Sequence, residues 1–436
     1  MKNAVKGVFL ISLILGIISC KDDKDGPPTY NPTVPVEVTS FFPEEGSSGS
    51  QLLIHGVNFG TDTTQVKVTV NDKRAVLISV SGTSIYCLVP PQAGNGTIKV
   101  EVGTGDQIQQ GISQKEFEYI PNLVVKTLAG WVDRDGNSSI IDGSFEEAQF
   151  ETPYWMVPDK DGDNIYLIEQ ERGLRVISLK ERKVTTLFRT GNGMEKPRSM
   201  AFSPDYEKLY IFNDQDKDDG IGVVVAHRKD NFKTWEILAR SGSCCGGDCN
   251  PVTGDLFFNR WNGGEYYKWN FETSVKDFIF RVDNGFNSAL IFSEDGLAAY
   301  IVSMSQHCIY KLDYDMTEGK LGGLRIFCGK KSNHDQGGFA DGPGSKARFN
   351  EPQQGTFDED GNFYICDQSN HCIRKIEPNG QVTTFAGRPG EWGYTDGDLR
   401  KEARFDRPHG IAYNKKTKEF YIADRNNRRI RIITKE

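Results

Sequence analysis

The chain has 436 residues, more than a single hydrophobic core normally serves, so at least two domains are expected. Charged residues make up 26% of the chain and hydrophobic residues 37%, a balance typical of folded globular domains. The formal net charge of −8 disfavours a phosphate-backbone ligand, so we expect no nucleic acid among the partners.

The first twenty residues are predicted to be an export signal. Lys2 and Lys6 precede an apolar run, Val8 to Ile18, which is too short to span a bilayer comfortably. The run ends in Ile-Ile-Ser-Cys20, a sequence that resembles the bacterial lipobox, in which the cysteine becomes lipidated. We therefore expect residues 1–20 to be a lipoprotein signal peptide with Cys20 as the lipidation site. An ordinary signal peptide with a chance cysteine is the alternative.

Residues 21–35 are predicted to form a flexible tether. The run from Lys21 to Asp25 is fully charged, and the segment from Gly26 to Pro35 contains four prolines. The charged run resembles the acidic tag that follows the lipidated cysteine in surface lipoproteins of Bacteroidetes-type bacteria. The resemblance implies a protein held on the outer membrane by its lipid alone and facing the cell exterior.

Residues 36–120 are predicted to form a small β-sandwich. About seven short segments separated by Gly-rich breaks read as strands, and several of them, such as Val66 to Val70 and Thr97 to Val102, alternate apolar with polar residues. The segment Gly56-Val-Asn-Phe-Gly60 and the closing Phe117-Glu-Tyr119 resemble the IPT/TIG immunoglobulin-like family. That family serves mostly as a spacer or interaction module, so we expect a pedestal here.

Residues 121–436 contain an internal repeat. The string Phe-Tyr-Ile-Cys-Asp at 363–367 recurs as Phe-Tyr-Ile-Ala-Asp at 420–424, and looser copies start at 165, 209, 256 and 299. Each copy follows a short strand with a polar turn, which for the third copy is placed at 250–254, and precedes another strand. A fourth strand follows five of the six copies.

The sixth copy reaches the end of the chain without a fourth strand. A matching strand, Leu123 to Gly130, stands at the other end of the repeat region, with Thr-Leu-Ala-Gly in place of Thr-Phe-Ala-Gly. We expect it to complete the last repeat, which closes a ring and leaves no open sheet edges. The predicted fold is therefore all-β: an immunoglobulin-like β-sandwich at 36–120 and a six-bladed β-propeller at 121–436, closed by its N-terminal strand.

Three of the repeats carry a longer loop signature that begins with Asp142-Gly143, Asp341-Gly342 or Asp396-Gly397. With the loops after 363–367 and 420–424, it resembles the NHL-repeat family of propellers. The resemblance implies that Arg374 and Arg431 form ion pairs between blades.

The predicted binding face is the rim that carries the long insertions 130–153, 329–352 and 387–408 and the loops between second and third strands. Function tends to lie on long loops held by a rigid scaffold. Aromatic rings and Arg, Asn and Gln side chains on this rim suit sugars, since rings pack on C–H faces and the polar groups bond hydroxyls and carboxylates. The candidate ligand-binding residues are Tyr154, Trp155, Arg198, Arg260, Trp261, Asn287, Gln353, Trp392, Tyr394 and His409.

Each of these residues also has a structural interpretation. Aromatic residues in propellers usually pack between blades, and Trp155 adjoins a buried strand. The Asp and Asn residues in the loops between second and third strands commonly bond to nearby backbone.

No metal or other cofactor is expected. The acidic loops at 159–163 and 214–219 permit a calcium site, but both lack the EF-hand pattern and suit turns or a solvated charge run. Cys244, Cys245 and Cys249 lack a fourth zinc ligand, which favours a local disulfide or free thiols.

Three functions are compatible with the sequence. The first is a non-catalytic surface protein that binds a glycan or another extracellular ligand. The second is a metal-dependent lyase or lactonase, an activity of some related propellers. The third is an interaction scaffold for outer-membrane proteins.

Overall fold

The computed structural model describes residues 29–282 and 287–436 of the chain. The chain divides into two compact units, with the division between Asn122 and Leu123. The predicted signal peptide, its lipidation site Cys20 and most of the predicted tether lie outside the described residues. Within the described ranges, no helix has the length and apolar character needed to cross a membrane.

The first unit is a β-sandwich of two sheets, with strand orders β1-β3-β7-β6 and β2-β9-β8-β4-β5. Alternate side chains of one strand face the core, and Leu52 and Ile54 are accordingly fully buried. The elements are β1 (Glu37–Phe42), β2 (Glu45–Gly46), β3 (Gln51–Val57), η1 (Thr63–Gln65), β4 (Val66–Val70), β5 (Lys73–Arg74), β6 (Val76–Ser81), β7 (Ser84–Leu88), β8 (Gly96–Val102), η2 (Gly105–Gln107) and β9 (Gln109–Tyr119).

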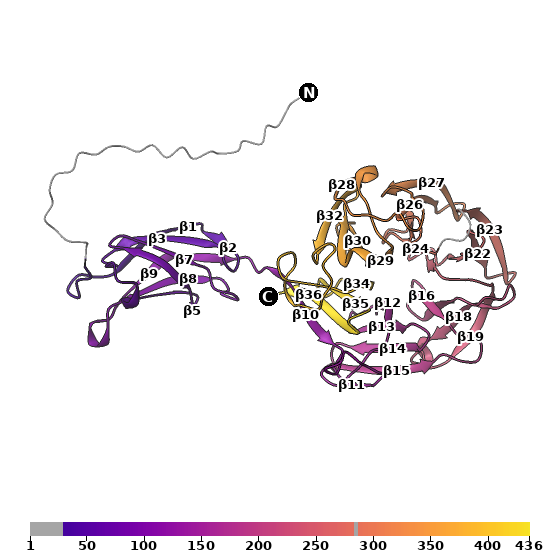
Figure 1. Ribbon diagram of the computed structural model, residues 1–436, viewed down its shortest axis with the longest axis horizontal. Coiled ribbons are helices and arrows are strands. Elements are labelled where there is room, and N and C mark those ends of the chain that lie inside the picture. Colours follow the sequence, from indigo (N-terminus) through magenta and orange to yellow (C-terminus); the bar gives the residue numbers. More distant parts are fainter. Residues whose placement is uncertain (1–28, 283–286) are drawn as a thin grey trace, which may run out of the picture. The chain divides into compact units, whose positions relative to one another are not determined.

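The second unit is a β-propeller. Its described residues form six sheets around a common axis (Figure 1), which confirms the predicted number of blades. The strands of blades one to three, innermost first, are β12 (Pro153–Pro158), β13 (Asn164–Glu169), β14 (Gly173–Ser178) and β15 (Lys183–Arg189); β16 (Pro197–Phe202), β17 (Lys208–Asn213), β18 (Ile221–His227) and β19 (Trp235–Arg240); β20 (Gly247–Cys249), β21 (Leu256–Arg260), β22 (Glu265–Asn270) and β23 (Val275–Arg281).

The other three blades follow the same order. Their strands are β24 (Ser288–Phe292), β25 (Ala298–Ser303), β26 (Cys308–Asp315) and β27 (Lys320–Cys328); β29 (Pro352–Phe357), β30 (Phe363–Asp367), β31 (Cys372–Ile376) and β32 (Gln381–Ala386); β34 (Pro408–Asn414), β35 (Glu419–Asp424), β36 (Arg429–Lys435) and β10 (Leu123–Ala129). Short pieces complete the unit: β11 (Gly143–Ser144), β28 (Gly342–Pro343), β33 (Gly397–Asp398), η3 (Arg228–Asp230), η4 (Gly344–Lys346) and η5 (Gln368–Asn370).

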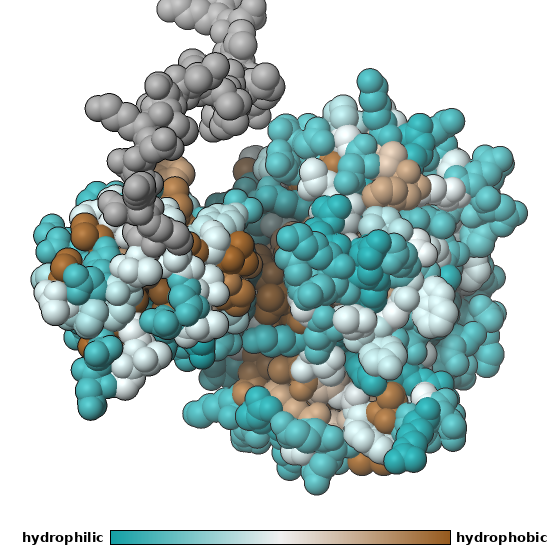
Figure 2. All heavy atoms as spheres, turned by 60° about the vertical axis from the view of Figure 1, so that its left-hand side comes forward, coloured by the Kyte–Doolittle hydropathy of each residue, from teal (hydrophilic) through white to brown (hydrophobic). Residues whose placement is uncertain are grey.

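The ring closes as the sequence predicts. Strand β10 pairs antiparallel with β36, so that Val125 lies opposite Ile433 and the fourth strand of blade six comes from the start of the unit. Apolar side chains fill the spaces between neighbouring blades; the rings of Tyr364 in blade five and Phe420 in blade six, for example, have centroids 4.5 Å apart. The propeller surface visible in Figure 2 is mainly hydrophilic, with small hydrophobic patches scattered over it.

One inner strand differs from its prediction. The segment 250–254 was expected to contain both the first strand and the turn of blade three, but it is only the turn. The first strand is β20, three residues earlier, where it pairs with β21. Its sequence, Gly247-Asp248-Cys249, has no apolar alternation, so the periodicity gave no signal for it.

Buried arginines fasten three of the long insertions to their blades. Arg431 of β36 is fully buried and donates to Asp424 at 2.8 Å and to Asp396 of the insertion at 2.5 Å. Asp396 in turn accepts the backbone N–H of Thr127 in the closing strand at 2.9 Å. The insertion therefore holds β10 in place.

The same arrangement recurs in blades one and five. Arg175 pairs with Glu169 and Asp142, and Arg374 pairs with Asp367 and Asp341. In each case the partners belong to the arginine's own blade or to the insertion that precedes it. The prediction that Arg374 and Arg431 link different blades is therefore wrong: the insertion folds back along the outer edge of its own sheet, which brings its aspartate to the arginine.

Replacing Arg431 should strongly destabilise the protein. The Arg431→Met variant leaves the Asp424 carboxyl buried without its charge partner, and burial already raises the pKa of Asp424 to about 6. We expect a loss of about 3–5 kcal/mol in the free energy of unfolding, measured by circular dichroism during urea denaturation. Arg182→Met is the control, since its pair with Glu146 is exposed and is worth at most about 1 kcal/mol. Equal losses in the two variants would contradict the assignment.

Candidate functional site

Six of the predicted residues meet at the propeller axis. They line a small hollow of about 50 Å³ on the insertion face, the rim that carries the long insertions and the loops between second and third strands. We call this hollow the mouth. The predicted residues that line it are Tyr154, Trp155, Arg198, Asn287, Gln353 and His409.

Buried polar side chains at the ends of second strands hold the loops that enter the mouth. Glu169 accepts the backbone N–H groups of residues 151 and 152, and Asn213 accepts those of residues 195 and 196. Asp424 accepts the N–H of Asp406 at 2.8 Å. These polar residues therefore support the loops, as their structural interpretation predicts, and do not face a ligand.

Tyr154 and His409 stack on one side of the mouth. Their ring centroids lie 3.4 Å apart with an interplanar angle of 28°. Burial holds the pKa of His409 well below its usual value, and the Nδ1 atom lies 3.2 Å from the backbone oxygen of Tyr154. The imidazole is therefore neutral, and Nδ1 carries the proton that it donates to this oxygen.

Arg198 and Trp261 share one carboxylate. Asp214 is buried and accepts from Arg198 at 3.1 Å through one oxygen and from the indole N–H of Trp261 at 2.9 Å through the other. Burial alone would lower the pKa of Arg198. The nearby Tyr154 and Asp214 raise it by more, so the net shift is upward. Trp261 is thus coupled to the mouth through Asp214, although its ring does not line the hollow.

Two further arginines near the mouth were not predicted. Burial lowers the pKa of Arg425, and the nearby charges of Arg407 and Arg198 lower it further. Arg407 pairs with Glu351 at 2.6 Å, whereas the side chain of Arg425 donates only to Gln170 at 3.2 Å, and its buried Nε has no partner among the described residues. Arg425 directly follows β35, as Asp214 follows β17, and that shared position could have identified it.

The remaining three predicted residues do not line the mouth. Arg260 pairs with Asp218 in a neighbouring loop. Trp392 and Tyr394 stand on the insertion 387–408 with 71% and 65% of their surfaces exposed, and the guanidinium of Arg429 lies 4.7 Å from the Tyr394 ring centre. Both rings are therefore exposed and lie outside the mouth lining.

The described residues offer no site that fits a metal. No group of three His, Cys, Asp or Glu side chains within the described ranges is arranged to hold one. At the mouth, burial raises the pKa of the Cys245 thiol to about 11, and His409 is held by Tyr154. A metal-dependent lyase or lactonase would need ligands here, so we derive no step through a metal.

The acidic loops and the cysteines have other roles. Asp159 pairs with Arg228 at 2.9 Å and Asp163 with Lys416 at 2.7 Å, so two of the three carboxylates of the loop 159–163 have cationic partners. All eight described cysteines are free thiols. Of the three clustered cysteines, Cys249 belongs to β20 and not to a loop.

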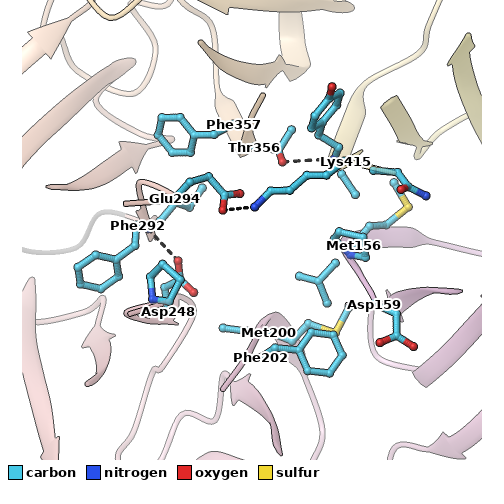
Figure 3. A pocket seen from close by; sticks show the side chains of 18 of the residues that line it. Met156, Asp159, Met200, Phe202, Asp248, Phe292, Glu294, Thr356, Phe357 and Lys415 are labelled. Atoms are coloured by element: carbon cyan, nitrogen blue, oxygen red, sulfur yellow. Dashed lines mark hydrogen bonds and ion pairs between the residues drawn. The ribbon is translucent and has the colours of Figure 1, made fainter. Parts of the chain in front are cut away.

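A larger cavity of about 400 Å³ opens on the opposite rim, the hairpin face, where first and second strands turn into each other. All six blades line it. Its wall includes Met156, Met200, Phe202, Phe292 and Phe357, and charged side chains surround its opening (Figure 3). This cavity was not predicted from the sequence, because short hairpins and inner strands form it and no long loop marks it.

Asp248 of β20 lies in the wall of this cavity (Figure 3). One carboxyl oxygen accepts the backbone N–H of Cys249 and the other accepts that of Phe292, both at 2.8 Å. Burial raises the pKa of Asp248 to about 7, and the charge of Glu294 adds to this shift.

The raised pKa makes the stability of the protein depend on pH. In the unfolded chain an aspartate titrates near pH ~4, so between that value and about 7 only the folded state retains the proton on Asp248. The contribution of this group to the free energy of unfolding therefore falls as the pH rises. The Asp248→Thr variant should gain stability relative to the wild type, on the order of 2 kcal/mol from about pH 5 to about pH 7.5, measured by urea denaturation.

Thr356→Val is the matched control, because Thr356 occupies the equivalent position in blade five and does not titrate. Its stability difference from the wild type should be constant over this pH range. A constant difference for Asp248→Thr as well would contradict the prediction.

Comparison with known proteins agrees with this architecture. The family model described as IPT/TIG domain matches residues 35–119, the model described as SMP-30/Gluconolactonase/LRE-like region matches 244–395, and the model described as NHL repeat matches 405–433. Among curated relatives, the Arabidopsis thaliana protein named SUPPRESSOR OF QUENCHING 1, chloroplastic, is 26% identical over 324 residues. This match covers 69% of the present chain and only 27% of that relative.

Solved structures of Bacteroides proteins resemble the chain over nearly its whole length. An auxiliary nutrient binding protein from Bacteroides thetaiotaomicron is 34% identical with a TM-score of 0.81, and the match covers 93% of this chain and 99% of that one. A second from Bacteroides ovatus is 30% identical with a TM-score of 0.73, covering 94% and 100%. A protein described as a putative phosphatase from Bacteroides thetaiotaomicron is 27% identical with a TM-score of 0.83, covering 94% and 99%. The chain therefore belongs to the family of the Bacteroides auxiliary nutrient binding proteins, and in this chain an IPT/TIG domain precedes an NHL-repeat β-propeller.

Proposed function

We propose that the protein is a non-catalytic cell-surface protein that captures an extracellular glycan at the mouth on the insertion face. Two relatives that match over nearly their whole length are described as auxiliary nutrient binding proteins, which supports a nutrient as the ligand. The observation that carries the proposal is the convergence of aromatic, amide and guanidinium groups on this mouth. The proposed place of action is the outer membrane, with Cys20 as the lipid anchor.

The guanidinium groups suggest which glycan fits. Arg198 and Arg407 each have a carboxylate partner, whereas no described carboxylate lies within ion-pair distance of Arg425. A sugar carboxylate placed beside Arg425 would supply the missing charge partner through two parallel hydrogen bonds. The partly exposed Tyr154 next to it offers a ring face for the sugar C–H groups. An acidic polysaccharide is therefore the proposed ligand class.

Replacing Arg425 should weaken glycan binding. We expect the protein without residues 1–20 to be retarded in native gels that contain an acidic polysaccharide such as polygalacturonate, and less in gels with a neutral one. Arg425→Gln should raise the Kd about 10-fold or more, since a charge-assisted hydrogen bond contributes about 1.5–3 kcal/mol. Arg182→Gln, in the turn between β14 and β15, should bind like the wild type.

Three results would contradict the proposed function. Retardation by no polysaccharide, or an unchanged Kd for Arg425→Gln, would refute this glycan site. Release of a soluble product from the polysaccharide would indicate an enzyme. Co-purification with outer-membrane proteins, without binding to any glycan, would indicate a scaffold.

A further inference from the structure

The cavity on the hairpin face has a chemistry of its own. Its volume of about 400 Å³ lies within the range of small-molecule binding sites, and it is about eight times larger than the mouth. Two methionines and three phenylalanines line it together with charged side chains such as Asp248 and Glu294, whereas arginine, histidine and amide groups are among the residues that line the mouth. The two ends of the propeller are therefore built for different ligands.

Asp248 is the exceptional residue in this wall. The first strands of the six blades pair with their second strands in the same register, so each blade contributes one residue at an equivalent position. The residues equivalent to Asp248 are Val157, Ala201, Ile291, Thr356 and Ala412. Five blades thus place an uncharged residue at this level of the axis, and only blade three places a carboxyl group there.

The structural duty of Asp248 does not require a charge. Its Oδ2 accepts the backbone N–H of Phe292 on the next blade, at the inner edge of the sheet. Thr356 performs the same task in blade five, where its hydroxyl accepts the N–H of Tyr413 on blade six at 3.3 Å. A neutral hydroxyl can therefore satisfy the strand edge. The second bond that the carboxyl accepts, from the N–H of the adjacent Cys249, does not require a charge either. The carboxyl at 248 therefore costs desolvation energy that its two backbone bonds do not explain.

The Asp248 carboxyl also lacks a cationic partner. Among the described residues, no Lys, Arg or His side chain forms an ion pair with it, whereas Lys415 pairs with Glu294 (Figure 3). Arg228 and Lys416 pair with Asp159 and Asp163. Lys415 and Lys416 of the cavity lining are thus engaged elsewhere, and the Asp248 carboxyl remains available to an entering cation.

We propose that this cavity is a second binding site, which takes a small molecule with an apolar body and a protonated amine. The amine binds the Asp248 carboxylate, and the apolar body packs against Met200, Phe202 and Phe292 on the wall. Binding neutralises the partly buried carboxylate and removes apolar ligand surface from water. The site does not depend on the glycan proposal, because it opens on the other rim and shares none of its charged residues with the mouth.

The test uses phenethylamine as the probe and 2-phenylethanol as its neutral counterpart of nearly equal shape. Isothermal titration at about pH 8 keeps the amine protonated and Asp248 largely ionised. We expect the amine to bind at least about 10-fold more tightly than the alcohol, as a charge-assisted hydrogen bond to the carboxylate predicts. Equal affinities, or no binding of the amine at millimolar concentration, would overturn the proposal without any variant.

Two variants test whether Asp248 causes the preference for the amine over the alcohol. Asp248→Thr copies blade five, so it keeps an acceptor for the Phe292 N–H and should bind the amine and the alcohol equally weakly. Thr356→Val alters the equivalent position without changing charge and should retain the preference for the amine. Retention of that preference in Asp248→Thr would overturn the proposal. The retardation of Asp248→Thr in gels that contain the polysaccharide should equal that of the wild type. A loss of amine binding can then be told apart from a failure of the glycan site.

Discussion

The antiparallel pairing of β10 with β36 is the constraint on which the rest of the propeller depends. It joins the start of the unit to its final strand and removes the two sheet edges that an open array of blades would expose. It also decides which residues meet at the axis. Tyr154 from blade one stacks on His409 from blade six, and Gln354 from blade five accepts the N–H groups of Met156 and Ile411 on those two blades. These contacts exist only in a closed ring.

Five of the six blades hold a neighbouring loop or insertion through polar side chains, and they do so in two ways. Blades one, five and six bury an arginine between two carboxylates, one on the second strand and one on the preceding insertion. Blades two and three use the neutral side chains of Asn213 and Asn259 to hold the entering loops. The charged version fastens a long insertion to the outer edge of its sheet. The neutral version needs only a short loop, and the cavity residue Asp248 follows such a loop.

Most of the fold could be predicted from the sequence, but the candidate site could be predicted only in part. Six repeated strand patterns and the match between Thr-Leu-Ala-Gly130 and Thr-Phe-Ala-Gly387 carry the architecture, since strand periodicity and closure are local properties of the chain. The positions of the repeated strands also predict the mouth, because they identify the residues that enter the first strand of each blade. Arg425 could not be predicted as a site residue, because its lack of a charge partner depends on loops that are far apart in sequence. Asp248 could not be predicted either, because the sequence Gly-Asp-Cys has no strand-like pattern and the cavity that Asp248 lines results from the packing of six blades.

Trp155 has a consequence for the propeller as a whole. Its side chain is almost completely buried, its indole N–H bonds to the backbone oxygen of Met200 at 3.2 Å, and it lines both the mouth and the cavity. Among the described residues, the mouth and the cavity are separate hollows that share Trp155 alone, so its indole forms part of the wall between them. Each end can therefore diverge in specificity through its other lining residues without altering what the opposite end retains.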